Sequence, residues 1–307
     1  MRWAYTFVVL VVGVLGCRDV DRDPPRITPD ADVDPDHPYP APRADLVPAV
    51  GSESTLELAT WNIENFPADS DTASVVADVI TSLDLDIIVV EEIASETAWA
   101  ELLTRLRGYA GILSTHSYSA ADYQKIGVIY RTSLVTASPP KLLFPADGYA
   151  FPRPPLAVTL TVDGASFEVI GVHLKAGVEL DDAERRRAAV FDLDAFLRAQ
   201  VAAGGEHEIV VLGDYNERVV ASADREILAP FLTAPDQYTV RTEPIALGGG
   251  ITYLGFGGSL LDHITTTAGF DARWTPARVE VQRLDRLITS YRSHVSDHLP
   301  VVLIAPR

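Results

Sequence analysis

The chain has 307 residues, 47% of them hydrophobic, so it can bury a sizeable core as one large domain or as two small ones. Its 43 Asp and Glu outnumber its 25 Lys and Arg, and the formal net charge of -18 excludes a non-specific attraction between the whole surface and a polyanion. Any phosphate group that the protein binds must therefore be held locally, by cations and a few placed basic side chains.

The N-terminus has the features of a signal peptide. Residues 5–15 form an apolar run that is too short to span a bilayer, and a single arginine precedes it. The run ends in VLGC at residues 14–17, which resembles a bacterial lipobox with Cys17 as the acylated residue. We expect residues 1–17 to be a lipoprotein signal peptide and the exported protein to be lipid-anchored in the cell envelope. Arg18, in place of an aspartate, favours the outer membrane of a Gram-negative host. The alternatives are a signal peptide that is cleaved at another residue and the ordinary N-terminus of a soluble protein.

The mature chain is predicted to be a tether followed by one domain without disulfides. Cys17 is the only cysteine, which excludes disulfides, structural thiolate metal sites and cysteine nucleophiles from that domain. Residues 18–54 are rich in Asp and Pro and have no hydrophobic periodicity, which predicts a disordered, extended linker. The domain itself is expected over residues 55–307.

Strand-like and helix-like segments alternate after residue 55. Hydrophobic or alternating runs predict β-strands over residues 56–61, 86–90, 126–130, 156–162, 167–173, 209–212, 262–265 and 299–304. Apolar residues at helical spacing predict helices over residues 75–83, 99–106 and 190–201. Neither a repeat nor a second linker interrupts this region, so we expect one α/β domain.

Polar residues stand where four of the predicted strands end. They are Asn62, Glu92, His173 and Asp214. Each alone has an ordinary interpretation, as a turn residue, a solvated carboxylate or a hydrogen-bonded core histidine. Sheets of α/β proteins place their binding and catalytic groups at strand ends, so the four together predict a functional site.

The motifs TWNIEN, VVEEI, GVHLKAG, VLGDYNE, LLDHI and VSDHLP follow one another between residues 56 and 304. This order resembles the endonuclease/exonuclease/phosphatase superfamily, which includes deoxyribonuclease I, AP endonucleases, neutral sphingomyelinases and inositol-phosphate phosphatases. GDYN and SDHLP are specific as a pair, whereas TWNIEN or HLK alone would be weak. The resemblance implies a four-layer α/β sandwich, in which two packed, mainly antiparallel sheets are flanked by helices and a cleft lies at one end.

The same resemblance implies a set of metal ligands. Glu92 would be the central ligand, Asn62 would assist through its amide oxygen, and Asp297 would lie beside the metal. Carboxylate and amide oxygens are hard ligands that suit Mg²⁺ or Mn²⁺. Glu91 occupies the place where many relatives carry Gln, which leaves open which of the two neighbouring carboxylates binds.

The resemblance also implies the groups that move protons and contact the phosphate. His298 corresponds to the catalytic histidine, and Asp262 to the carboxylate that orients it and raises its basicity. Asp214 and Asn216 match the GDxN pair, in which the Asn donates to a phosphate oxygen. His173 corresponds to a second histidine that donates to the phosphate or the leaving group. How the proton transfers divide among Asp214, His173 and His298 stays open.

Two further residues are candidates by resemblance. Arg153 corresponds to an arginine that binds a substrate phosphate, and a guanidinium fork suits that role. Gln124 stands where deoxyribonuclease I has a glutamate that orients the second histidine. The arginines at residues 185–187, by contrast, are expected to form a solvated helix face.

The sequence therefore predicts a metal-dependent phosphodiester hydrolase, and first a nuclease. A lipid or small-molecule phosphodiesterase or phosphatase would use the same site, and a membrane anchor would suit it. A non-catalytic surface lipoprotein that retains only the fold is a third hypothesis, although every metal and histidine position is filled. The expected partners are a nucleic acid or another phosphodiester, and a membrane through the N-terminal anchor only. No obligate protein partner is evident.

Overall fold

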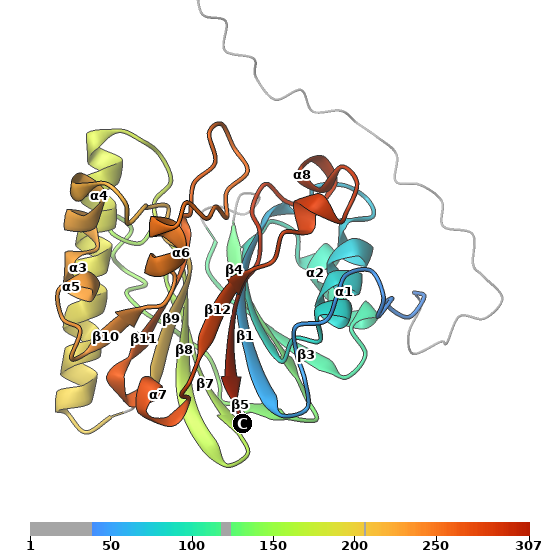
Figure 1. The fold of residues 1–307 in the computed structure, drawn as a ribbon, viewed down its shortest axis with the longest axis horizontal. Helices are drawn as coiled ribbons and strands as arrows, with labels where there is room; N and C mark the ends of the chain where they lie inside the picture. The colour runs from blue at the N-terminus through green and yellow to red at the C-terminus, as the bar shows by residue number, and fades with distance from the viewer. Residues whose placement is uncertain (1–38, 118–123, 206) are drawn as a thin grey trace, which may run out of the picture.

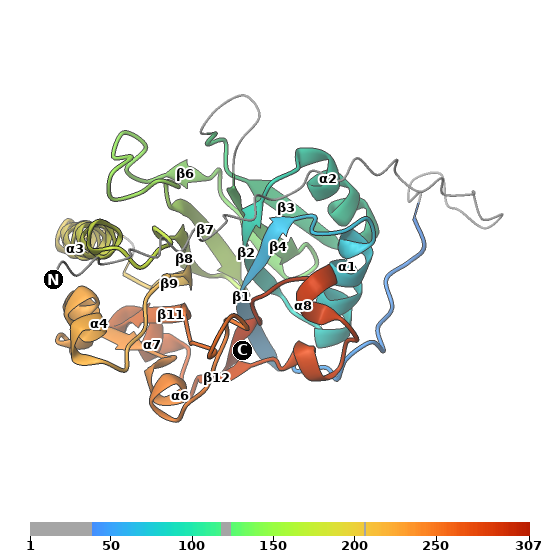
Figure 2. The same cartoon turned by 90° about the horizontal axis from the view of Figure 1, so that it is seen from above.

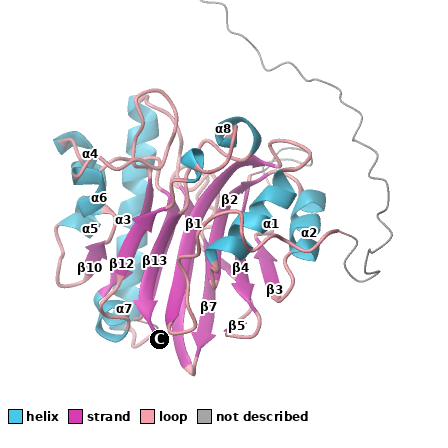
Figure 3. Ribbon diagram, turned by 45° about the vertical axis from the view of Figure 1, so that its right-hand side comes forward, coloured by secondary structure: helices cyan, strands magenta, loops and turns pink. Residues whose placement is uncertain are grey.

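The structure is a computed structural model that describes residues 39–117, 124–205 and 207–307. The predicted signal peptide with Cys17 and the first half of the predicted linker lie outside these ranges. Two sheets pack face to face and helices cover both outer faces, as the expected four-layer sandwich requires (Figures 1 and 3).

The first sheet has one parallel pair at its centre. Its order is β12 (Arg278–Val281), β13 (Val301–Pro306), β1 (Thr55–Phe66), β2 (Ile87–Ile93), β4 (Lys125–Arg131) and β3 (Tyr109–Leu113). Only β1 and β2 run parallel to each other, and the other neighbours are antiparallel. The carboxyl ends of β1 and β2, which carry Asn62 and Glu92, therefore lie at the same edge.

The second sheet repeats this arrangement. Its order is β10 (Tyr238–Val240), β11 (Asp262–Thr267), β9 (Ile209–Asp214), β8 (Ala165–His173), β7 (Leu156–Val162) and β5 (Val135–Ala137), with β6 (Lys141–Leu142) also paired to β7. Only β8 and β9 are parallel. The register of this pair sets His173 directly opposite Asp214 at its end.

The helices lie outside the two sheets. Seen from above in Figure 2, α1, α2 and α8 lie on one side of the strands, and α3 and α4 lie on the other. The helices are α1 (Thr72–Leu83), α2 (Glu96–Arg105), α3 (Leu180–Ala202), α4 (Ser222–Ile227), α5 (Ala229–Leu232), α6 (Glu243–Leu247), α7 (Ala268–Arg273), the 3₁₀ turn η1 (Leu284–Arg286) and α8 (Tyr291–His294).

Strand periodicity explains how the core is divided into layers. Along β1, Leu56 and Leu58 pack between the two sheets, whereas Ala59, Trp61 and Ile63 pack under α1 and α2. Successive side chains of a strand point to opposite faces, so a strand in the middle of four layers is apolar on both faces. This explains why β1 reads as a nearly continuous apolar run. A third cluster fills the space between the second sheet and α3.

The packed domain begins before the predicted boundary at residue 55. The Arg43 backbone N–H donates to Asp78 Oδ1 at 2.7 Å, and the Leu46 N–H donates to Ser82 Oγ at 3.0 Å. Val47 is buried among the residues under α1. These contacts attach the end of the Asp- and Pro-rich segment to α1. In the described part of the chain, no helix is both long and apolar enough to cross a membrane.

Candidate active site

A cleft of about 690 Å³ opens at the edge where the central parallel strands end. It is lined by residues from both sheets and from the segments that follow them, including Glu64, Glu92, Asp214, Asn216, Tyr253, Asp297 and His298. The fold thus brings most of the residues singled out in the sequence to one place.

His298 and Asp262 form a buried pair. His298 Nδ1 lies 2.8 Å from Asp262 Oδ2, and the two residues are 5% and 0% exposed. Burial alone would lower the pKa of His298, but the carboxylates of Asp262 and Asp214 outweigh it and raise that pKa to about 10. The neighbouring carboxylates therefore favour the protonated imidazole, whose Nε2 lies 3.9 Å from Asp214 Oδ2 and 3.8 Å from Asp297 Oδ1.

Asp214 lies between the two histidines. Its Oδ2 is 3.9 Å from His298 Nε2 and 3.7 Å from His173 Nε2. Burial raises the pKa of Asp214 to about 7, partly opposed by the positive charge of His298. Burial lowers the pKa of His173 well below its ordinary value, and nearby Arg153 adds to this effect, so His173 is neutral. The site therefore combines one charged and one neutral imidazole, and of the two only His298 lines the cleft.

The turn after β9 fixes the GDYN residues. Gly213 has φ +147°, and a Cβ at that position would meet the Val172 carbonyl oxygen of β8 at 1.8 Å, so only glycine fits. The next turn folds back, because the Asn216 backbone N–H donates to Asp214 Oδ1 at 2.8 Å and its side-chain Nδ2 donates to Asp214 Oδ2 at 3.0 Å. Asn216 is thus held at the cleft surface with its amide group beside Asp214.

A bulge in β2 decides which of the two neighbouring glutamates enters the cleft. The pairing of β2 with β4 shifts after Val90, and Glu92 adopts φ +64°. Glu91 points into the protein, where it is fully buried and accepts a hydrogen bond from Thr60 Oγ1 at 2.8 Å. Glu92 lines the cleft. The geometry therefore presents Glu92, and not Glu91, to a ligand.

Asn62 uses its amide differently from the expectation drawn from the resemblance. Its Nδ2 donates to Glu92 Oε1 at 3.2 Å and to Asp214 Oδ2 at 3.1 Å. Its Oδ1, the atom expected to bind metal, accepts a hydrogen bond from the Glu64 N–H at 3.0 Å. In this structure Asn62 therefore bridges the carboxylates of the two sheets through its nitrogen.

The cleft carboxylates fit a hard divalent cation. Glu64, Glu92 and Asp297 line it together. Burial and the charges of neighbouring carboxylates raise the pKa values of Glu64 and Asp297, and a bound cation would relieve that repulsion. Ligand atoms of Asp214, Asp262 and His298 also lie within 4.8 Å of one another and could hold a metal.

Arg153 and Gln124 lie together beside this site. Arg153 Nη1 donates to the Leu174 carbonyl oxygen at 3.3 Å, and Nη2 donates to Gln124 Oε1. Neither is among the residues that line the cleft. Gln124 contacts Glu92 and not His173, whose Nδ1 is buried without a hydrogen-bond partner.

Several residues of the site were not predicted from the sequence, and Glu64 of the cleft is one of them. The Tyr253 ring lies 5.1 Å from the His298 ring and lines the cleft. Tyr291 Oη donates to the His298 carbonyl oxygen at 2.5 Å and accepts from Trp61 Nε1 at 3.0 Å. The expectation of a solvated face at residues 185–187 is wrong for Arg186, which is buried in an ion pair with Glu217 at 2.9 Å. Long-range contacts of this kind leave no periodic signal in the sequence.

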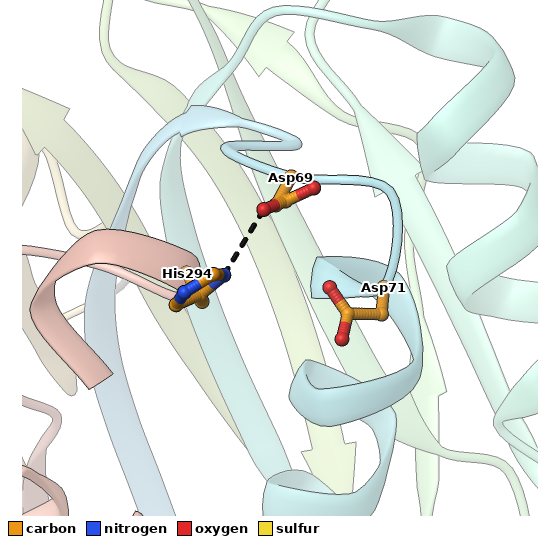
Figure 4. A group of neighbouring side chains, drawn as sticks. All are labelled: Asp69, Asp71 and His294. Carbon is orange, nitrogen blue, oxygen red and sulfur yellow. Dashed lines mark hydrogen bonds and ion pairs between the residues drawn. The ribbon is translucent and has the colours of Figure 1, made fainter. Parts of the chain in front are cut away.

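A second group of possible metal ligands lies on the surface and does not line the cleft. Figure 4 shows Asp69, Asp71 and His294, with His294 Nδ1 3.0 Å from Asp69 Oδ2. The His294 side chain is 49% exposed, and exposed ion pairs of this kind contribute about 0–1 kcal/mol. We assign this group no part in the site.

Comparisons with known proteins agree with this fold. Residues 59–298 match the Endonuclease/Exonuclease/phosphatase family, while no curated protein matches the chain. Among solved structures, D. rerio TDP2 complexed with single strand DNA product is 14% identical with TM-score 0.60, over 83% of this chain and 100% of its own. The 3'-5' exonuclease NExo from Neisseria meningitidis is 19% identical with TM-score 0.61, over 81% and 98%. The human Nocturnin catalytic domain with bound sulfate anion is 18% identical with TM-score 0.60, over 82% and 93%. At these identities the likeness shows the fold.

Proposed function

This chain belongs to the endonuclease/exonuclease/phosphatase family, and from its site we propose that it is a magnesium-dependent phosphodiesterase that cleaves nucleic acid. The observation that carries the proposal is the meeting of a buried His298–Asp262 pair, the carboxylate of Asp214 and an acidic cleft at one edge of the sandwich.

These groups can activate water and receive a proton. Asp214, with a pKa of about 7, can accept a proton from a water in the cleft, and the positive charge of the neighbouring His298 stabilises its carboxylate. Asp262 holds the imidazole of His298 in one orientation, because it fixes the proton on Nδ1. The proton of the attacking water thus has a short path within buried groups.

Other groups can meet the negative charge of the phosphate. Asn216 lines the cleft, and its amide nitrogen, which donates to Asp214 Oδ2 and to the Leu174 carbonyl oxygen, would donate to a phosphate by exchanging one of these partners. Neutral His173, beside Asp214 and Glu92, would donate to the phosphate or to the leaving oxygen. When Mg²⁺ or Mn²⁺ is bound by Glu92 and Asp297, it supplies charge stabilisation for the phosphate that the acidic cleft itself lacks. This division of labour explains how a protein of net charge -18 could act on an anion.

Nucleic acid is the preferred substrate class because structures of the same fold were solved with DNA, namely D. rerio TDP2 with single strand DNA product and the Neisseria 3' phosphatase NExo with a product DNA hairpin. The strong negative charge disfavours long contacts with a duplex backbone. We therefore favour a strand end or a short single strand over the interior of a duplex.

The direct test is hydrolysis by the purified protein of single-stranded and duplex oligonucleotides, RNA, sphingomyelin and a generic phosphodiester, each with Mg²⁺ and with EDTA. Metal-dependent cleavage of an oligonucleotide supports the proposal. If the protein cleaves the generic phosphodiester but none of the nucleic acids, the nuclease proposal is rejected and the phosphodiesterase proposal remains.

One observation favours a second candidate, a lipid phosphodiesterase. Phe256 is fully exposed between Tyr253 of the cleft and β11, and Val178, which lines the cleft, is 97% exposed. Exposed apolar side chains beside a cleft are typical of surfaces that contact apolar ligands. Turnover of sphingomyelin with none of any oligonucleotide would select this candidate.

A further inference from the structure

The side chain of Gln124 connects two parts of the site. Its Nε2 donates to Glu92 Oε2 at 3.0 Å and to Asn65 Oδ1 at 2.7 Å, while its Oε1 accepts from Arg153 Nη2. Arg153 in turn is held by the Leu174 carbonyl oxygen, directly after His173 at the end of β8. A continuous chain of hydrogen bonds therefore runs from the end of β8 to Glu92.

From this chain we propose that Gln124, oriented by Arg153, is a positioning residue that fixes the carboxylate of Glu92 for metal binding. The proposal rests on the proposed function only in taking Glu92 as a metal ligand. It assigns to Arg153 a role in holding Gln124, where the family resemblance implied direct binding of a substrate phosphate.

The other contacts of Glu92 show what Gln124 adds. Asn62 Nδ2 donates to Oε1, and the Asn65 backbone N–H donates to Oε2 at 2.9 Å. Asn62 and Asn65 both belong to β1. Gln124 reaches Oε2 from the segment before β4 and adds a second donor to that oxygen, from a different element of the sheet. Partners of this kind orient metal-ligating side chains and raise metal affinity.

Arg153 decides which way the Gln124 amide points. A guanidinium has donors only, so it must face the amide oxygen. The amide nitrogen is then directed at Glu92, where a carboxylate needs a donor. Without Arg153, the amide could turn its oxygen toward the carboxylate of Glu92, and the two acceptors would repel each other. The Arg153 guanidinium is also half-buried and donates to the Leu174 carbonyl oxygen and to Gln124 Oε1, which fits a structural position better than a solvated one.

The test measures metal affinity directly, by calorimetric titration of the purified full chain with Mn²⁺ and by the electron paramagnetic resonance signal of bound Mn²⁺. The Mn²⁺ binding event to be compared among the variants is the one that Glu92→Gln removes. Gln124→Met keeps the side-chain length and loses all three side-chain hydrogen bonds, and we expect it to weaken that event by about 10- to 100-fold, the usual effect of losing a partner of a metal ligand. Gln124→Ala should do the same. Gln237→Ala, in a glutamine that lines a different pocket, is the matched control and should bind like wild type.

A double variant separates the two roles of Arg153. If Arg153 acts through Gln124, Arg153→Met weakens Mn²⁺ binding in the same direction, and adding it to Gln124→Met has no further effect. Wild-type Mn²⁺ affinity in Gln124→Met, or in Arg153→Met, would overturn the proposal. These readouts need no turnover, so their failure leaves the proposed function standing, and an inactive wild type with the expected Mn²⁺ pattern would reject the proposed function alone.

Discussion

His298 Nδ1 and Asp262 Oδ2 are 2.8 Å apart in a fully buried contact between the segment before β13 and the start of β11. Replacing His298 by Ala should therefore lower kcat by roughly a hundredfold to ten-thousandfold, the range for a positioned acid or base, with little change in metal affinity. Asp262→Asn should lose less, because the imidazole remains but is less well oriented. Steady-state kinetics on the cleaved substrate measures both, and normal turnover by His298→Ala would contradict the assigned role.

Glu92 should respond to metal concentration in a way that His298 does not. Glu92→Gln removes the charge of the cleft carboxylate that we propose binds the metal, so we expect weaker Mg²⁺ binding and partial recovery of activity in excess Mg²⁺. His298→Ala should gain nothing from the excess. Activity measured across a Mg²⁺ titration distinguishes the two, and equal rescue of both variants would argue against separate roles.

Metal removal should abolish activity reversibly. Exhaustive dialysis against EDTA should leave no turnover, and Mg²⁺ or Mn²⁺ should restore it, whereas Zn²⁺ should restore it poorly because the cleft offers oxygen ligands. The rate of substrate hydrolysis after each addition is the measurement. Full turnover in EDTA would exclude the metal mechanism.

Glu57, a residue of β1 that does not line the cleft, should make stability depend on pH. It is 1% exposed with both carboxylate oxygens lacking a hydrogen-bond partner, and burial, with the charge of neighbouring Asp86, raises its pKa from 4.5 to about 8. The pKa of Glu57 is higher in the folded than in the unfolded protein. The stability that protonated Glu57 contributes is therefore fully present below pH 4.5 and is lost as the pH rises through 8. Arg131 also donates a hydrogen bond to Asp86, and this contact limits the effect of the Asp86 charge on Glu57.

The measurement is the melting temperature of wild type and Glu57→Gln between pH 5 and pH 9. Toward high pH, the melting temperature of the variant should rise by several degrees relative to that of wild type, since about 1 kcal/mol corresponds to roughly 2–4 °C in a domain of this size. Glu53→Gln, an exposed neighbour, is the control and should show no such trend. A difference that stays constant over this range would show that Glu57 is ionised throughout.

The predicted lipobox leads to a test of location. If Cys17 is acylated, the protein should fractionate with membranes, and Cys17→Ala should release it to the soluble fraction. Immunoblots of membrane and soluble fractions measure the change. A Cys17→Ala protein that stays with membranes would show that the anchor lies elsewhere.

The elements that position the site were predictable because they rest on local patterns. The strand ends at Asn62, Glu92, His173 and Asp214 follow from apolar runs that stop at a polar residue, and the observed strands end at or near them. Their convergence follows from the two central parallel pairs.

The errors occur where tertiary contacts override local patterns. Val201 follows the apolar spacing of α3 but is 47% exposed near the helix end, whereas Arg186 is buried because Glu217 and two carbonyl groups receive it. The short edge strand β3 carries glycine and tyrosine and gave no clear strand pattern. The orientation of the Asn62 amide depends on partners 30 and 152 residues away.

The left-handed backbone at Glu92 implies that thermal stability and hydrolytic activity place opposite demands on this residue. A glutamate at φ +64° costs about 1–3 kcal/mol of backbone strain, and its carboxylate adds repulsion to an already acidic cleft. Glycine at this position would relax the turn and remove the charge together. Laboratory evolution that rewards heat resistance alone should therefore enrich Glu92→Gly and yield robust but inert proteins, whereas a screen that also demands hydrolysis should keep the strained glutamate.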